Sequence, residues 1–180
     1  PRRIDQAVGD RERPHGRTQV AAVAAPVDER AVDRDLPVQV IDIVAGDIGC
    51  YTLGVLPPYQ GMDTCVAMGA SLGVGLGLRH VLPEQDARRV VSIIGDSTFI
   101  HTGVNGLIEM VYNPPSTGHV LIVLDNGTTA MTGQQEHPGT GRTLEHERTG
   151  KVSIEGLARA VGVKNVDVVD PVKDPGGWEK

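Results

Sequence analysis

Residues 89–99 read RVVSIIGDSTF, and this stretch holds the features that decide the fold. Its apolar first half predicts a buried strand that ends at Gly95, where a glycine lets the backbone turn sharply or approach a ligand. Ser97 can cap a helix over residues 99–112, in which apolar side chains recur at helical spacing. A strand that leads through a short polar turn into a helix is the repeating unit of an α/β protein.

The rest of the chain repeats this alternation of strand and helix. Helices are also expected over residues 64–79 and after Ser153, with Gly162 ending the second of these. The predicted strands are residues 38–44, 89–94, 119–124 and 165–169. Because the strands are nearly continuous apolar runs separated by helices, we expect an α/β fold: a mostly parallel sheet with helices on both faces.

Residues 1–37 differ in composition from the rest of the chain. They contain seven Arg and seven Asp or Glu without a sustained hydrophobic period, which predicts an irregular or mobile arm. The run AAVAAPV at residues 21–27 is the one part of this arm that can form a short element. Residues 38–180 are then expected to form a single domain.

The overall composition argues against several classes of function. The net charge of −6 and the aromatic content of 3% disfavour nucleic-acid binding, which uses basic and aromatic side chains. No apolar run approaches the roughly 20 residues that cross a bilayer, and the first ten residues lack the apolar core of a signal peptide. We therefore expect a cytoplasmic protein without membrane contact. Cys50 and Cys65 are too few for a four-thiolate metal site.

Small and polar residues follow the first three predicted strands, at Asp47, Asp96 and Asn126. Ligands of a parallel α/β sheet bind at this carboxyl edge. The helix after Asp96 would offer its free N–H groups to a phosphate, and a carboxylate beside a phosphate is favourable when Mg²⁺ lies between them. Asn126 could supply a neutral oxygen to the same ion. Taken alone, Asp96 is explained equally well as a helix cap.

The glycine-rich run MGASLGVGLGL, residues 68–78, has two explanations. It resembles the pyrophosphate loop of short-chain dehydrogenases, which predicts a nicotinamide-dependent reductase. The preceding residues are a poor strand, however, and that family's Tyr-x-x-x-Lys pair is absent. The alternative is a helix in which Gly69, Gly73 and Gly77 form a face without side chains for very close packing.

A long polar segment, residues 127–151, follows the third strand, and its Thr and Gly content favours a loop that wraps a ligand. His137 in this segment can orient a substrate or be a solvated loop residue. Cys50, at the edge of the first strand, can contact a cofactor or serve as a small packing residue.

Four ordered motifs closely resemble the thiamine-diphosphate domain of the alpha subunits of indolepyruvate ferredoxin oxidoreductases, members of the 2-oxoacid:ferredoxin oxidoreductase family. They are GDIGCYTLG, PPYQGMDTCVAMGAS, GDSTFIHTG and NPPSTGHVLIVLDNGTTAMTGQQEHPGTG, at residues 46–54, 57–71, 95–103 and 113–141. The resemblance extends over residues 40–172, and LDNGTTAMTG is its most distinctive part.

The resemblance implies a thiamine-diphosphate-binding fold and a set of cofactor contacts. Magnesium would be held by Asp96, Asn126 and the carbonyl of Thr128, and would bridge the diphosphate. The other residues of the predicted cofactor-binding set are Gly95, Ser97 and Thr129 at the diphosphate, Gly49, Cys50, Met68 and Gly69 near the thiazolium and pyrimidine rings, and Asp47 at the same edge.

The implied reaction is the oxidative decarboxylation of 2-oxo acids, arylpyruvates such as indolepyruvate among them, to acyl-coenzyme A. Its partners would be a 2-oxo acid, coenzyme A, a pyrimidine-binding domain and a ferredoxin-type domain or subunit carrying [4Fe-4S] clusters, in an oligomer.

The chain also departs from the family pattern. Residues 1–37 lack the family's Cys-x-x-Cys-Pro-His-Arg segment, the ferredoxin-like cysteines are absent, and the last strand is cut short after Asp170. We therefore expect a domain truncated at its C-terminus, and we assign no catalytic acid or base within it. The competing hypotheses are an inactive truncated relic of this domain and the nicotinamide-dependent reductase.

Overall fold

The computed structural model describes the backbone of Gln19–Ala25 and then residues 43–170 and Lys173; the other residues are outside the described part. A six-stranded sheet with the order β3-β2-β4-β5-β1-β6 forms its centre. The first four of these neighbours are parallel, and β1 runs antiparallel to both β5 and β6. The strands are β1 (Gln19–Ala25), β2 (Ile43–Gly46), β3 (Thr64–Cys65), β4 (Val90–Gly95), β5 (His119–Asp125) and β6 (Asn165–Val169).

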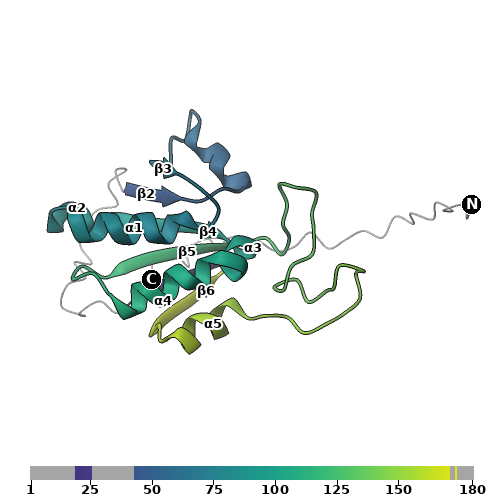
Figure 1. Cartoon of the computed structure of the whole chain (residues 1–180). Coiled ribbons are helices and arrows are strands. Elements are labelled where there is room, and N and C mark those ends of the chain that lie inside the picture. Colours follow the sequence, from purple (N-terminus) through teal and green to yellow (C-terminus); the bar gives the residue numbers. More distant parts are fainter. Residues whose placement is uncertain (1–18, 26–42, 171–172, 174–180) are drawn as a thin grey trace, which may run out of the picture.

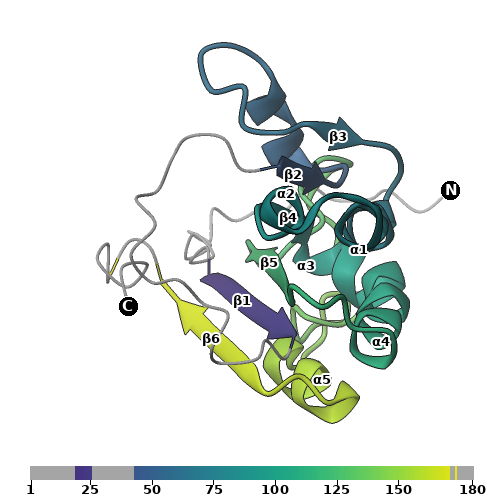
Figure 2. The same ribbon diagram turned by 90° about the vertical axis from the view of Figure 1, so that its left-hand side faces the viewer.

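Three helices pack on this sheet (Figure 1), and the view along the sheet places all three on one side of it (Figure 2). They are α1 (Ala70–Val81), α4 (Val104–Tyr112) and α5 (Ile154–Val161). The shorter helical elements are the 3-10 helix η2 (Cys50–Val55), α2 (Glu84–Ala87), α3 (Asp96–Thr98) and the π-helix η3 (Phe99–Gly103). Within the described residues, no helix is both long and apolar enough to cross a membrane.

The α/β fold class is confirmed, as are the strands predicted over residues 89–94, 119–124 and 165–169. The strand predicted over residues 38–44 is confirmed from Ile43 onward, and residues 38–42 lie outside the described part. The caps of α5 also agree with the sequence. Ser153 Oγ accepts a hydrogen bond from Gly156 N, and Gly162 ends the helix at a φ of 112°.

Strand β1 lies within the segment predicted to be an irregular arm. Its residues, QVAAVAA, overlap the AAVAAPV run for which a short element was considered. Because alanine is depleted in strands, local sequence gave a weak signal, and pairing with β5 and β6 supplies the context. The other residues of 1–37 are not described, so the boundary at residue 37 stays a prediction.

Two predicted features of the helical layer differ from the structure. The helix expected from residue 64 begins at Ala70, because Thr64–Cys65 pair with β2 as a short edge strand. The described helices α1, α4 and α5 cover only one face of the sheet, where helices on both faces were expected. Along β5, buried side chains such as Leu121 alternate with partly exposed ones such as Ile122. The continuous apolar sequence of β5 predicted burial on both faces of the sheet, whereas only one face of this strand is fully buried.

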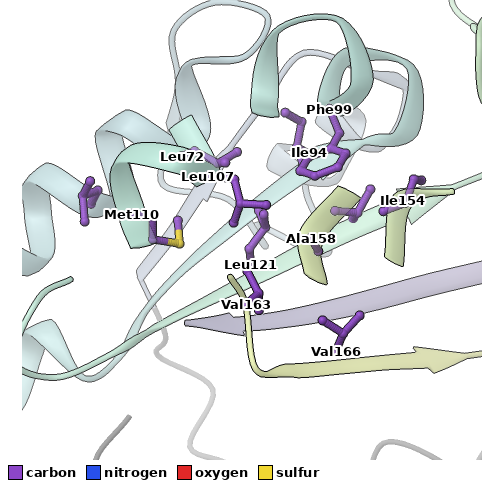
Figure 3. Packing of buried hydrophobic residues seen from close by; sticks show 12 residues of the cluster. Leu72, Ile94, Phe99, Leu107, Met110, Leu121, Ile154, Ala158, Val163 and Val166 are labelled. Carbon is purple, nitrogen blue, oxygen red and sulfur yellow. The ribbon is translucent and has the colours of Figure 1, made fainter. Parts of the chain in front are cut away.

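The hydrophobic core fills the space between the sheet and the helices (Figure 3). Phe99, Leu107 and Leu121 are each fully buried. Such side chains stabilise the fold by roughly 1.5–3 kcal/mol each relative to exposure. The cluster comprises Leu72, Leu76, Ile94, Phe99, Leu107, Met110, Leu121, Val123, Ile154, Ala158, Val163 and Val166.

The close-packing glycine of α1 is Gly75, whereas Gly73 and Gly77 were predicted to form that face. A Cβ on Gly75 would overlap Oγ of Ser92 and would lie 2.9 Å from Cε1 of His119. Gly73 and Gly77 are exposed and have no neighbour that a Cβ would meet. Helix α1 therefore rests on β4 and β5 through Gly75, and the predicted glycine face is wrong by two residues.

Candidate functional site

The site predicted from the sequence lies where β2, β4 and β5 end. These strands are parallel neighbours, so their carboxyl ends share one edge of the sheet. The long segment that follows β5 extends from this edge, on the right of Figure 1. The residues after the three strands therefore meet at one place, as the sequence predicted.

Asp96 is the central carboxylate of this edge and is buried. It begins the helical stretch α3–η3–α4, and the N-cap is Gly95 rather than Ser97. Its Oδ1 accepts from Ser97 N at 2.8 Å and its Oδ2 accepts from Gly127 N at 3.0 Å. Asp96 thus joins the turn after β4 to the turn after β5. Since Gly95 provides no capping side chain, the start of this helix suits an anionic ligand.

A second carboxylate, Asp125, ends β5 beside Asp96. Burial, together with the hydrogen bond and the charge of Asp96, raises the pKa of Asp125 to about 6. Burial alone would also raise the pKa of Asp96, but His137, Asp125 and the Ser97 N–H outweigh it and hold that pKa below its ordinary value. Asp96 is buried and Asp125 is partly buried. Two adjacent carboxylates of this kind repel each other when both are ionised, and a cation between them would relieve this.

His137 approaches Asp96 from the long segment after β5. Its Nε2 lies 3.2 Å from Asp96 Oδ2, without the alignment of a hydrogen bond. Its Nδ1 accepts from Gly139 N at 3.1 Å, so the proton of the neutral ring is on Nε2 and faces the carboxylate. The imidazole is buried. Of the two alternatives for His137, a solvated loop residue is therefore wrong.

The hydroxyl groups predicted to line a diphosphate site are brought together. Ser97 Oγ and Thr129 Oγ1 are 2.7 Å apart, across the turns after β4 and β5. Ser97 lies in the first turn of the helix, next to its free N–H groups. Two hydroxyls and a helix start are the donors that a phosphate requires.

The remaining predicted metal ligands are in the turn after β5. Asn126 is exposed, and its Oδ1 accepts from Thr128 N at 3.0 Å. No group of three or more His, Cys, Asp or Glu side chains in the described chain is placed to hold a metal. The predicted set is of another kind, one carboxylate with an amide and a carbonyl oxygen. Those hard oxygens, with the paired carboxylates, fit Mg²⁺.

The predicted ring contacts lie around the end of β2 and the start of α1. Asp47 is buried, and its Oδ2 accepts from Gly69 N at 2.7 Å, which joins these two places. Gly69 has a φ of 89°, a left-handed conformation that favours glycine. Cys50 and Met68, on either side, are exposed. A small buried packing role for Cys50 is therefore wrong.

Tyr51 was not predicted as a site residue, and it connects the two halves of the edge. Its Oη accepts from Gly95 N at 3.0 Å, which joins η2, after β2, to the end of β4. Burial, with the negative charge of Asp47, raises the pKa of Tyr51 well above its ordinary value. Asp125 and Ser71 were also missed. Only Asp125 carried a sequence signal, its place beside Asn126 at a strand end.

The run MGASLGVGLGL does not form a loop between a strand and a helix. Helix α1 begins at Ala70, so only Gly69 precedes it, and Gly73, Gly75 and Gly77 are helical. The glycine loop that a nicotinamide-dependent reductase requires is therefore not formed here.

Comparison with known proteins agrees with this geometry. The family model described as the C-terminal TPP-binding domain of thiamine pyrophosphate enzymes matches residues 47–175. The chain is similar to the indolepyruvate oxidoreductase subunit IorA of Archaeoglobus fulgidus, with 50% identity over 125 residues, 69% of this chain and 19% of that protein. For the protein of the same name from Thermococcus kodakarensis, the identity is 48% over 139 residues, 72% and 21% of the two chains.

The chain thus spans about one fifth of the length of these curated relatives. No solved structure gives a significant match.

Proposed function

The chain belongs to the thiamine pyrophosphate enzymes, whose C-terminal cofactor-binding domain it carries, and we propose that it binds thiamine diphosphate through Mg²⁺ at the carboxyl edge of its sheet. The observation that carries this proposal is the junction at Asp96. This carboxylate stands at an uncapped helix start and is hydrogen-bonded to the turn that holds Asn126 and Thr128.

In this proposal Asp96, Asn126 and the carbonyl of Thr128 hold the metal ion. The ion offsets the negative charge of the diphosphate, which would otherwise lie against the carboxylates of Asp96 and Asp125. Ser97 and Thr129 donate their hydroxyl protons to phosphate oxygens, in exchange for the hydrogen bond that they share now. The N–H groups at the start of α3 add the favourable end of the helix dipole.

The segments around the end of β2 and the start of α1 flank the coenzyme's rings in this arrangement. Gly49 and Gly69 pack closely against the side chains of Tyr51 and Thr102, which a Cβ at either position would overlap. Cys50 and Met68 present sulfur-containing side chains from an exposed position. When bound, thiamine diphosphate would supply a carbanion that adds to the keto group of a 2-oxo acid and a cationic ring that takes up the electron pair left behind when carbon dioxide departs.

The two relatives are named as subunits of indolepyruvate oxidoreductase. We therefore infer that the substrate is an arylpyruvate of this type, oxidised in the presence of coenzyme A to an acyl-coenzyme A. The chain has two cysteines, Cys50 and Cys65, whereas a [4Fe-4S] cluster takes four. The iron–sulfur acceptor would accordingly be on another polypeptide segment, as would the pyrimidine-binding half of the site.

Replacement of Asp96 tests the metal assignment. Asp96→Asn keeps the shape and an acceptor oxygen but removes the negative charge, so magnesium-dependent binding of thiamine diphosphate should weaken by about 100-fold or more, as expected when an ion loses its charged ligand. Calorimetric titration in excess Mg²⁺ measures this. The matched control is Asp167→Asn, an exposed carboxylate of β6, which should bind as the parent does.

Equal affinity of Asp96→Asn and the parent would show that the metal is not held at Asp96. A parent chain that binds no thiamine diphosphate, alone or with a pyrimidine-binding partner, would instead support the inactive relic.

A further inference from the structure

Asp47 was predicted to contact the cofactor, yet the structure gives its carboxylate a different set of partners. The residue is 0% exposed. Oδ1 accepts from Ile48 N at 2.7 Å, and Oδ2 accepts from Gly69 N at 2.7 Å and from Ser71 Oγ at 3.2 Å. These three hydrogen bonds, two of them on one oxygen, fill most of the roughly four acceptor sites of an ionised carboxylate, whereas Asp96 accepts one backbone hydrogen bond per oxygen, so Asp47 has little capacity left for an outside ligand.

Through these hydrogen bonds Asp47, which follows β2, caps the N-terminus of helix α1. Gly69 is the N-cap of α1 and supplies no capping side chain. The carboxylate from the end of β2 takes this place, and it approaches Ser71 N, in the same first turn, at 3.5 Å. A negative charge at a helix N-terminus is favourable, more so where water is excluded.

The conformation of the turn before α1 leaves little freedom to replace this contact. Gly69 has a φ of 89°, and a Cβ at this position would overlap the hydroxyl of Thr102 in η3. The backbone of Met68 and Gly69 is thus confined between η3 and the Asp47 carboxylate.

The main chain of Asp47 holds the opposite segment as well. Its carbonyl oxygen accepts from Thr52 Oγ1 at 2.9 Å, and the same hydroxyl accepts from Gly49 N at 2.8 Å. The turn of Gly49 and Cys50 is therefore tied to the residue whose side chain ties Gly69. One residue fixes both segments that would flank the coenzyme's rings.

We propose that Asp47 is a positioning residue: it sets the separation of the Gly49–Cys50 and Met68–Gly69 segments and does not itself touch the coenzyme. This inference rests on the proposed function, because those segments matter only if the rings lie between them. The metal and diphosphate contacts are on the turns after β4 and β5, around Asp96, and none of the hydrogen bonds of the Asp47 carboxylate reaches them.

The test separates binding of the rings from binding of the diphosphate. In the full chain, Asp47→Asn leaves one acceptor oxygen and directs an amide group at a backbone N–H. Calorimetry should show the affinity for thiamine diphosphate with Mg²⁺ falling about tenfold or more, in line with the loss of a hydrogen bond to a charged group. Inorganic pyrophosphate has no rings, so its affinity in the presence of Mg²⁺ should stay within about twofold of the parent's. A change of that size is smaller than the loss of one hydrogen bond to a charged group would cause.

Two further variants complete the experiment. Gly69→Ala disturbs the same turn sterically and should lower the affinity for thiamine diphosphate but not for pyrophosphate, as Asp47→Asn does. Asp96→Asn should lower the affinity for both ligands. Loss of both ligands in Asp47→Asn would mean that this residue supports the whole edge, and unchanged affinity for both would mean that it positions nothing; either result overturns the inference. If the parent binds pyrophosphate with Mg²⁺ but does not bind thiamine diphosphate, either alone or with a pyrimidine-binding partner, the proposed function fails, and this inference fails with it.

Discussion

His119 is the buried histidine at the start of β5, and its environment makes it a neutral side chain. Ser92 Oγ donates to the Ser71 carbonyl at 2.9 Å, so at its 2.9 Å contact with His119 the hydroxyl accepts from Nε2. The other ring nitrogen, Nδ1, is buried without a hydrogen-bond partner. Burial, with the positive charge of Arg79, lowers the pKa of His119 to about 3.

This residue predicts a pH dependence of stability. As the pH falls below about 6.5, the unfolded chain binds a proton at this histidine before the folded chain does. The stabilisation of the folded state by the neutral His119 is complete above that pH. It is lost as the pH falls toward about 3, the pKa of His119 in the folded chain. The slope should approach about 1.4 kcal/mol per pH unit. Urea unfolding of the parent and of His119→Gln, which does not titrate, measures it between about pH 7 and about pH 5.

The parent should lose more stability than His119→Gln over this interval. Parallel curves for the two proteins would show that His119 is protonated in the folded state or is not buried in solution.

Helix α1 offers a matched pair of glycines at the scale of a single element. Gly75→Ala places a methyl group against Ser92 and His119, and overpacking of this kind costs about 1–3 kcal/mol. Gly77→Ala, one half-turn along the same helix, meets no atom and should stabilise the protein by up to about 1 kcal/mol, because alanine favours helix over glycine. Thermal unfolding of both variants checks these opposite signs.

If both substitutions stabilise the protein, the contact of α1 with the sheet at Gly75 is wrong. If both destabilise it, Gly77 is not on the exposed face.

Elements with local signals were predicted well from the sequence. Helix α5 carries its own start and stop in Ser153 and Gly162, and both function as such in the structure. Strands β4 and β5 are apolar runs that end at a polar pair. In each case the deciding interaction is made by neighbouring residues, so a single sequence contains it.

Features that depend on distant contacts were not predictable in this way. The position of β1 between β5 and β6 depends on pairing partners about 100 or more residues further along the chain. Gly75 is the close-packing glycine of α1 because Ser92 and His119 lie against it. Helical spacing alone predicted Gly73 and Gly77 instead.

The candidate site shows the same division. Asp96, Ser97 and Thr129 were predicted from strand ends and from the family resemblance, and they do meet. The hydrogen bond from Gly95 N to Tyr51 spans 44 residues and carries no sequence pattern. For Asp47, the sequence indicated the right place, but only the fold reveals that its carboxylate is already engaged.

At the scale of the whole molecule, residues 47–175 match the C-terminal cofactor-binding domain of thiamine pyrophosphate enzymes, and the chain spans about one fifth of the length of its curated relatives. Its sheet brings three turns together at one edge, and its described helices cover one face. The edge is internally connected: Tyr51 joins the turns of β2 and β4, and Asp96 joins those of β4 and β5. Because these turns are connected within one chain, we expect the proposed site to bind the diphosphate end of the coenzyme without a partner.

The most direct measurement is calorimetric titration of the chain with thiamine diphosphate, once in excess Mg²⁺ and once in a chelator that removes divalent cations. The account predicts saturable binding at one site per chain with Mg²⁺, loss of that binding in the chelator, and its return when Mg²⁺ is restored. Equal binding in the two buffers, or binding in neither whether the chain is alone or with a pyrimidine-binding partner, would contradict a coenzyme anchored by a metal ion between the turns after β4 and β5.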